Sequence, residues 1–231
     1  TKGSADLIIV GAGGAGLSAA VTAKDLGVKN VLVLEKMPVI GGNTLRCASA
    51  FNAADPDRQK ALPMTETLKE AVVKAINEKP VSEEHAKLMA DVKAKYEAYL
   101  KSGSKTLFDC PEWHALQTYN GGDKVGQIPL IRQYSNNVLD TLHWMQSKGS
   151  PVMDRVSQGA GALWQRTHQL DAPAGLGLID PLYQAAVKQG VNFKLGMRVQ
   201  DLILNDKGRV IGVTATDKVG NKYEFTSKDG V

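Results

Sequence analysis

Two stretches of consecutive apolar residues, at positions 7–10 and 31–34, lie on either side of a segment rich in glycine and alanine. Short continuous apolar runs are typical of strands that are buried on both faces. Small residues between two such runs permit a helix that packs closely against the strands. The pattern therefore predicts a βαβ unit over residues 5–46.

Helical periodicity replaces these runs in the middle of the chain. Residues 55–118 are mostly polar, and within residues 65–76 the apolar positions recur with the spacing of one helix face. Ser82 is followed by two acidic residues, a combination typical of a helix N-cap and first turn. We expect that helix to run to about Leu100.

Two more helices are expected in the second half of the chain. Residues 131–148 form an amphipathic pattern that is closed by Gly149. Residues 180–189 predict a helix with Asp180 as its N-cap and Pro181 in its first turn, where the missing N–H of proline does no harm.

The C-terminal part shows short apolar runs separated by turn-forming glycines. Residues 193–195 predict a short strand, and residues 200–205, 210–216 and 222–226 predict antiparallel strands. The whole pattern indicates an α/β fold: a Rossmann-like sheet with a helical insertion and a small antiparallel β excursion.

The turn after the first apolar run contains a G-x-G-x-x-G motif formed by Gly11, Gly13 and Gly16. In such a turn the first glycine permits the tight bend, the second lets the backbone approach a pyrophosphate, and the third lets the helix pack on the strand. Glu35 ends the second apolar run about 20 residues later, where a carboxylate accepts hydrogen bonds from a ribose. The motif predicts binding of FAD or NAD and disfavours NADP, whose 2′-phosphate the carboxylate would repel.

The segment that follows adds a more specific signal. Residues 35–44 read E-K-M-P-V-I-G-G-N-T, and residues 48–54 read A-S-A-F-N-A-A. With the glycine motif before them, these runs resemble the FAD domain of the soluble fumarate reductase, flavocytochrome c and urocanate reductase family. The family has two glycines where this chain has Ser49 and Ala50, which are also small.

This resemblance implies that FAD is the cofactor. Membrane-bound relatives attach FAD covalently through a histidine, and Asn43 stands at that position, so non-covalent binding is expected. Val199 occupies the place where the family's backbone brackets the adenine. The cofactor-binding residues that the resemblance and the glycine motif together imply are Gly11, Gly13, Gly14, Ala15, Gly16, Glu35, Lys36, Gly41, Gly42, Asn43, Thr44, Ser49, Ala50 and Val199.

The resemblance continues in the second half of the chain. Residues 159–168, which include Arg166 and His168, correspond to the family's G-G-A-S-x-x-R-x-H, and residues 174–177 correspond to its A-G-x-G. Residues 169–173 depart from the family's R-P-T-G-G. The sequence leaves open whether His168 lines the flavin or is a structural histidine.

Members of this family reduce an activated C=C bond of a carboxylate. They use hydride from FAD, an arginine as general acid, and cationic clamps on the carboxylates. Those residues come from a capping domain and from segments after an A-T-G-G strand, which is expected to begin just beyond Val231. The chain is therefore expected to be a partial FAD-binding domain over residues 1–231, with residues 55–118 as a helical insertion. Without the capping domain and the C-terminal part of the FAD domain it is expected to be inactive alone, and no catalytic residue is assigned.

Two other functions fit the same residues. The chain could be a non-catalytic FAD-binding or structural fragment, or part of a flavin dehydrogenase of the ketosteroid type. In the favoured case the partners of the parent protein are a small carboxylate substrate and the missing C-terminal segment or capping domain.

Composition narrows the remaining classes of function. The net charge is +4, and the basic residues are scattered rather than clustered beside aromatic residues, so no nucleic-acid binding is expected. No apolar run approaches the roughly 20 residues of a membrane span. Neither the two cysteines nor the histidines have metal-ligand spacing, so no metal is expected. Trp164 is left open between stacking on a ring and packing in the core. The chain starts with Thr1 and shows no signal peptide, which leaves both a cytoplasmic and an exported protein open.

Overall fold

The computed structural model describes residues 1–231, which form two compact units. Unit 1 consists of residues 1–49, 147–151 and 171–231. Unit 2 consists of residues 50–146 and 152–170, so along the chain it is inserted into unit 1.

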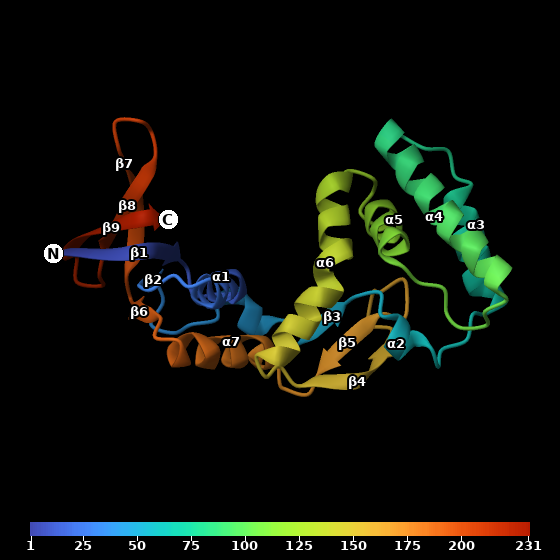
Figure 1. The fold of residues 1–231 in the computed structure, drawn as a ribbon, viewed down its shortest axis with the longest axis horizontal. Coiled ribbons are helices and arrows are strands. Elements are labelled where there is room, and N and C mark those ends of the chain that lie inside the picture. The colour runs from blue at the N-terminus through green and yellow to red at the C-terminus, as the bar shows by residue number, and fades with distance from the viewer. The chain divides into compact units, whose positions relative to one another are not determined.

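Unit 1 is built on a six-stranded sheet (Figure 1). The first three strands in its order are parallel, and the fourth strand is parallel to the third. Among the last three strands of the order, each neighbouring pair is antiparallel. The order is β6 (Asn192–Leu195), β2 (Val31–Glu35), β1 (Lys2–Val10), β9 (Lys222–Gly230), β8 (Val210–Thr216) and β7 (Arg198–Leu204).

The expected α/β class is confirmed, including the βαβ unit and the antiparallel strands. All five residues of β2 are buried, as its continuous apolar run predicts. β9 is longer than expected because it pairs with β1 as well as with β8 and continues as far as Gly230. The antiparallel strands therefore extend the same sheet instead of forming a separate layer.

Two helices of unit 1 lie against each other. α1 (Gly14–Asp25) follows β1 directly, and it contacts α7 (Leu176–Lys188), which leads into β6. Leu17, Ala20 and Val21 of α1 are fully buried. The small residues expected in this helix therefore serve close packing. A short 3-10 helix, η1 (Gly42–Arg46), follows β2.

The prediction for the start of α7 was wrong. Asp180 does not cap the helix: it begins at Leu176 with Gly175 as N-cap, and Pro181 lies inside it. The additional first turn extends the helix face on which Ile179 and Leu182 are buried. The stabilisation from burying this face outweighs the loss of the one backbone hydrogen bond that proline cannot make. The residue four positions before Pro181 is a glycine, which adds no side chain to the crowded turn.

Unit 2 contains five helices and a small antiparallel sheet of order β3-β5-β4 (Figure 1). Its core is centred on two tryptophans, Trp113 and Trp164, whose rings meet edge to face at 5.2 Å. The elements are β3 (Ala50–Asn52), α2 (Pro56–Gln59), α3 (Glu66–Ile76), α4 (Glu83–Ser102), α5 (Pro111–Gly121), α6 (Ile128–Ser147), β4 (Val152–Ser157) and β5 (Thr167–Leu170).

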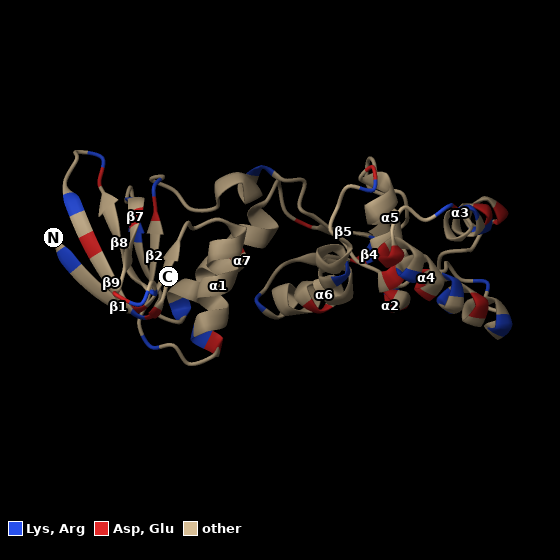
Figure 2. Ribbon diagram, turned by 90° about the horizontal axis from the view of Figure 1, so that it is seen from above, with Lys and Arg blue, Asp and Glu red and all other residues tan.

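The helices predicted in this region are confirmed, with small shifts at their ends. The Ser82 side chain accepts a hydrogen bond from His85 N at 3.1 Å and so caps α4. Leu88, Val92 and Tyr96 recur at every fourth position and are buried. Charged residues of both signs cover the rest of that helix (Figure 2). α6 begins three residues earlier than expected, at Ile128, which is itself buried.

The three strands of unit 2 were not predicted. β3 has only three residues, and its partner β5 lies more than a hundred positions further along the chain, as in the pair Phe51 and His168. Strands this short have no measurable periodicity, and their pairing depends on tertiary contacts. No helix in either unit combines the length and the apolar character that crossing a lipid bilayer requires.

Candidate functional site

The loop between β1 and α1 contains glycines that are required for different reasons. Gly11 adopts a φ of 101°, which L side chains rarely adopt. A Cβ on Gly16 would overlap the carbonyl oxygen of Gly11, so packing alone excludes a side chain there. A Cβ on Gly13 would meet nothing closer than the Gly41 oxygen at 3.7 Å. The protein's own packing therefore does not account for Gly13, and the space beside it is free for the close approach of a ligand.

The N-terminus of α1 is open toward this loop. Gly13 is the N-cap and offers no side-chain acceptor, and the first turn contains no acidic residue. The charged residues of the helix, Lys24 and Asp25, lie at its other end (Figure 2). The first-turn N–H groups have no partner within the helix and carry a partial positive charge. This is an arrangement that suits a diphosphate.

The Gly41–Thr44 segment, predicted as a second part of the site, lies directly on the first loop. Gly41 N donates to Ala12 O at 2.7 Å, and Gly14 N donates to Thr44 Oγ1 at 3.3 Å. A Cβ on Gly42 would lie 3.7 Å from the Cα of Gly13. The structure thus brings together two glycine segments that are separated along the chain, and Asn43 extends from η1 with its side chain exposed.

Glu35 organises the same loop. Its Oε2 accepts a hydrogen bond from Ala12 N and its Oε1 accepts one from Met37 N, both at 2.8 Å. The residue is 8% exposed, at the end of β2. A carboxylate has about four lone-pair positions, so two bonds leave acceptor capacity for ribose hydroxyls. The sequence predicted the ribose role but not the role in holding the loop.

A cavity of about 370 Å³ opens beside this carboxylate. Its volume lies in the range of small-molecule sites. The start of β7 closes one side, and Met197 N donates to the Glu35 backbone oxygen at 2.8 Å. The lining residues are Val10, Gly11, Leu34, Glu35, Lys36, Met197, Arg198 and Val199, so the two ends of the predicted adenosine site, Glu35 and Val199, share one cavity.

Ser49 and Ala50 replace glycines of the family pattern, and they differ in conformation. Ser49 is buried with φ of 52°, in the left-handed region, and its Oγ has no hydrogen-bond partner. A residue other than glycine in that region costs roughly 1–2 kcal/mol. The glycine of the family pattern thus corresponds to a real conformational requirement at position 49. Ala50 begins β3 of unit 2, where it pairs with Gln169.

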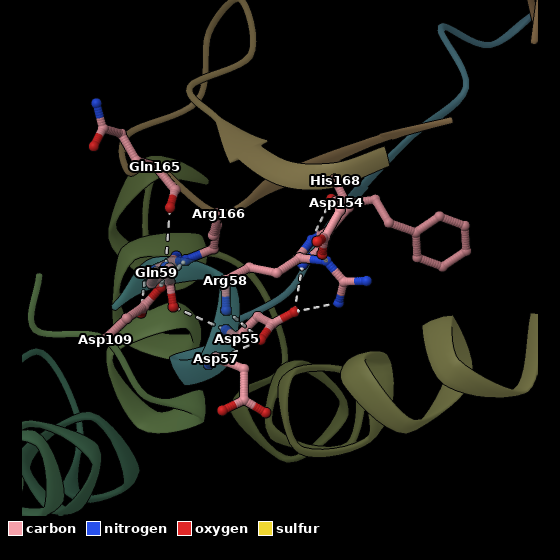
Figure 3. Close-up of polar contacts among 10 residues, drawn as sticks. Asp55, Asp57, Arg58, Gln59, Asp109, Asp154, Gln165, Arg166 and His168 are labelled. Atoms are coloured by element: carbon pink, nitrogen blue, oxygen red, sulfur yellow. Dashed lines mark hydrogen bonds and ion pairs between the residues drawn. The ribbon is translucent and has the colours of Figure 1, made fainter. Parts of the chain in front are cut away.

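His168, left open by the sequence, is held inside unit 2 (Figure 3). It is fully buried, and its Nε2 lies 2.9 Å from Asp55 Oδ2. Asp55 also caps α2 and accepts from Arg58 Nη1 at 2.9 Å. Burial acts to raise the pKa of Asp55, but the hydrogen bonds from His168 and Arg58 outweigh it and hold that pKa below its usual value.

The Arg166 side chain is likewise held by hydrogen bonds within unit 2. Its Nε and Nη2 donate to the two carboxylate oxygens of Asp109 at 3.0 and 2.6 Å, and both side chains are almost fully buried. Gln59 bridges this pair to Asp55, because its Nε2 donates to Asp109 Oδ2 and its Oε1 accepts from Asp55 N (Figure 3). Neither Asp109 nor Gln59 belongs to a recognisable motif, so sequence reasoning missed both.

The remaining candidate side chains are structural. Trp164 lies in the core of unit 2 and donates its indole N–H to Phe108 O at 2.9 Å. Cys110 caps α5 through its Sγ, and burial raises the pKa of this thiol to about 12, so it stays protonated. Cys47 is a free, half-buried cysteine.

Comparison with known proteins identifies the family. The FAD dependent oxidoreductase family matches residues 6–227. The chain belongs to this family. FAD is the cofactor of the family, and the open helix N-terminus, the unobstructed Gly13 and the cavity at Glu35 fit it.

Individual relatives agree with this assignment. The chain is 35% identical to the NADH:acrylate oxidoreductase of Vibrio harveyi, covering 98% of this chain and 24% of that protein. It is 30% identical to a fumarate reductase (cytochrome) of Shewanella frigidimarina, covering 90% of this chain and 29% of that protein. The open conformation of a flavocytochrome c3 fumarate reductase superposes with a TM-score of 0.72 at 26% identity, covering 98% of this chain and 32% of that one. The chain thus spans about a quarter to a third of the length of these relatives.

Proposed function

We propose that this chain is the FAD-binding part of a flavoprotein that reduces the C=C bond of an α,β-unsaturated carboxylate such as acrylate, fumarate or urocanate. The observation that carries the proposal is the meeting of two glycine segments at the open N-terminus of α1, beside the cavity at Glu35. The substrate class is supported by the relatives, which are named for acrylate and fumarate.

In this proposal different residues of the chain contact different parts of the cofactor. The amides that follow Gly13 face the pyrophosphate, and Glu35 accepts from the adenosine ribose. Gly41, Gly42, Asn43 and Thr44 pass close to the pyrophosphate and ribitol, and Val199 brackets the adenine. Gly14, Ala15, Gly16, Lys36, Ser49 and Ala50 complete the set that we propose.

When bound, FAD supplies the hydride for the reduction. The protein's task in this chain is to bind and orient it, because no residue placed here serves as the general acid. Asn43 has no nucleophile that could form a covalent flavin bond, so we expect acid precipitation of the protein to release all of its flavin into the supernatant.

We propose that residues 1–231 form a partial FAD-binding domain, with residues 55–118 as a helical insertion. The general acid and the carboxylate clamps then come from a longer parent protein, from the rest of its FAD domain and from a capping domain. The other partner of the parent is its small carboxylate substrate.

The proposed reaction is tested by the oxidation of a reduced dye with acrylate, fumarate or urocanate as acceptor. The longer parent protein is expected to oxidise the dye with at least one of the three, and the 231-residue chain with none. Turnover by the chain alone would contradict the placement of the acid outside it. A parent that binds FAD but ignores all three acids would contradict the substrate class and would favour a non-catalytic module or a dehydrogenase.

The binding role of Glu35 is tested by Glu35→Arg. The substitution removes the ribose acceptor and both loop hydrogen bonds, so flavin retention after gel filtration is expected to fall at least roughly tenfold, about 1.4 kcal/mol in binding free energy. Glu70→Arg, an exposed change of the same charge, is the control. Unchanged flavin retention in Glu35→Arg would show that the cavity at Glu35 does not hold the adenosine.

A further inference from the structure

The start of α4 in unit 2 contains a histidine that the proposed function does not use. His85 is fully buried although it lies in the first turn of the helix, three residues after the N-cap Ser82. Ser82 Oγ accepts from His85 N at 3.1 Å, and Val81 N in turn donates to His85 Nδ1 at 3.3 Å. Histidine thus plays the part that glutamate or glutamine plays in a capping box, with the N–H of Val81 in place of that of the N-cap.

The bond from Val81 fixes the protonation state of the His85 ring. A backbone N–H can only donate, so the Nδ1 atom that accepts from it carries no proton. In the neutral ring the proton then lies on Nε2, which is buried and makes no hydrogen bond of normal geometry. A second proton can enter only at Nδ1. That proton turns the acceptor of Val81 N into a donor, so one protonation breaks the bond and places a charge inside the protein.

The groups around the ring oppose its charge on balance. Burial lowers the pKa of His85 most, and the positive charge of Lys124, in the loop after α5, lowers it further. Glu78, in the connection from α3, and the Asn120 side chain of α5 act in the other direction. Lys124 and Glu78 form an ion pair of 2.9 Å, and Tyr119 of α5 meets the ring edge to face at 5.0 Å. The ring is therefore neutral at physiological pH and takes up a proton only in acid.

The lowered pKa sets the direction of the pH effect. Once the ring is in water its pKa returns to the ordinary value of 6.5, so the opened form takes up a proton more readily than the closed form. The closed form is therefore fully favoured above pH 6.5 and loses stability as the pH falls below that value. Because His85 lies at the end of a helix, local opening of the first turn is enough to expose the ring.

We propose that His85 is an acid-sensitive cap of α4. Protonation of the ring at Nδ1 breaks its bond to Val81 N and releases the first turn of α4 together with the connection from α3. The rest of unit 2 stays folded, because its core residues on α4, such as Leu88 and Val92, lie further along the helix. The cap lies within unit 2 and does not depend on the FAD proposal.

The test measures hydrogen exchange of individual backbone amides in the 231-residue chain, corrected for the intrinsic exchange rate at each pH. The informative amides are those of Val81, His85 and Ala86, which all take part in the cap. Their protection is expected to fall at least roughly tenfold between about pH 7 and about pH 4. Protection of residues 92–100, further along the same helix, is expected to change far less.

His85→Gln is the decisive variant. Glutamine keeps an acceptor oxygen, as in an ordinary capping box, but does not titrate, so the three amides are expected to stay protected in acid. The exposed change His143→Gln on α6 is the control and is expected to keep the acid loss. Should His85→Gln fail to fold by circular dichroism, the unchanged chain with isotope-labelled histidine makes the same test. The nitrogen signals of its ring show whether Nδ1 of His85 gains a proton as the amides lose protection.

The charges beside the ring allow a second test by direction. Lys124→Gln removes a positive charge that lowers the pKa of His85, so the cap is expected to open at a higher pH. Glu78→Gln removes a negative charge that raises this pKa, so the cap is expected to open at a lower pH. If the ion pair acted only as a structural contact, both changes would move the opening to higher pH, because each breaks the same pair.

Four results would overturn the proposal. They are unchanged protection of the three amides down to about pH 4, the same acid loss in a folded His85→Gln protein, loss of protection while Nδ1 stays unprotonated, and opening that moves in one direction in both Lys124→Gln and Glu78→Gln. Because none of these measurements involves flavin, their failure leaves the FAD-binding proposal standing, and loss of flavin binding leaves the cap standing.

Discussion

Gly13 and Gly16 lie in one motif, yet the protein's own packing requires glycine only at Gly16. At Gly16 the neighbouring Gly11 carbonyl leaves no room for a Cβ. At Gly13 the nearest atom to a Cβ would be 3.7 Å away, so packing leaves room for a methyl group, and we propose that a bound cofactor sets the restriction. Residues in a conserved-looking pattern can therefore be separated into packing and binding roles by the space around each one.

This difference gives a matched pair of variants. Gly16→Ala is expected to lower the free energy of unfolding by about 2–3 kcal/mol, because backbone must move to admit the methyl group. Gly13→Ala is expected to change it by less than about 1 kcal/mol and yet to lose flavin. Urea unfolding of the flavin-free proteins and flavin retention measure the two effects. Equal destabilisation by both changes would contradict the assignment.

Glu35 shows that one side chain can serve two roles. Its ribose role follows from its spacing after the glycines, whereas its bonds to Ala12 N and Met37 N depend on how the loop folds back over β2. The same carboxylate that is proposed to bind the cofactor thus also preorganises the loop that receives it.

At the scale of elements, the helix ends followed local chemistry where a capping side chain was present. Ser82 accepts a hydrogen bond from the N–H group three residues ahead, as its position predicted, and Thr65 does the same at the start of α3. Asp180 has the same local signal but does not cap α7, because the buried face of that helix extends it by a further turn toward the N-terminus. Capping chemistry thus decided helix ends only where burial did not oppose it.

Ser82→Ala is expected to lower the free energy of unfolding by about 1 kcal/mol, since His85 N loses its acceptor. Ser82→Gly is expected to cost only a few tenths, because glycine leaves the N-terminus open to water. Thermal unfolding compares the two. A Ser82→Ala protein as stable as the parent chain would show that water caps the helix equally well.

The network of Asp109, Arg166 and Gln59 joins α2 to the segment before β5. Asp109→Asn leaves the buried guanidinium with a neutral partner and is expected to cost about 3–5 kcal/mol. Glu66→Gln removes an ion pair whose carboxylate is 82% exposed, and it is expected to cost less than about 0.5 kcal/mol. Chemical denaturation measures both. A loss below 1 kcal/mol in Asp109→Asn would mean that Gln59 alone holds this junction.

At the scale of the whole molecule, a buried neutral histidine links stability to pH. His114 has a pKa of about 3 in the folded chain, below the 6.5 of an exposed histidine. Between these values the unfolded chain takes up a proton that the folded chain refuses, so stability falls as the pH falls from about 6.5 toward 3. Above 6.5 both forms are neutral and this effect vanishes.

His114→Gln is expected to reduce the loss of unfolding free energy between pH 6.5 and pH 4 by up to roughly 3 kcal/mol. The exposed change His143→Gln serves as the control. Urea unfolding at several pH values measures the slope for each protein. An identical acid slope in His114→Gln and the parent chain would place the acid sensitivity in other groups, such as the buried carboxyl of Asp55, whose pKa is lowered.

The sequence alone determined the βαβ unit, the glycine loop, most of the helices and the antiparallel strands near the C-terminus, because these depend on short-range periodicity, turns and caps. Only the tertiary structure decided that the chain forms two units, that β9 pairs with β1, that Arg166 and His168 are held by Asp109 and Asp55, and that Glu35 and Val199 share a cavity. Each of these joins residues distant along the chain, and no local pattern encodes which distant partner will satisfy a buried charge or complete a sheet.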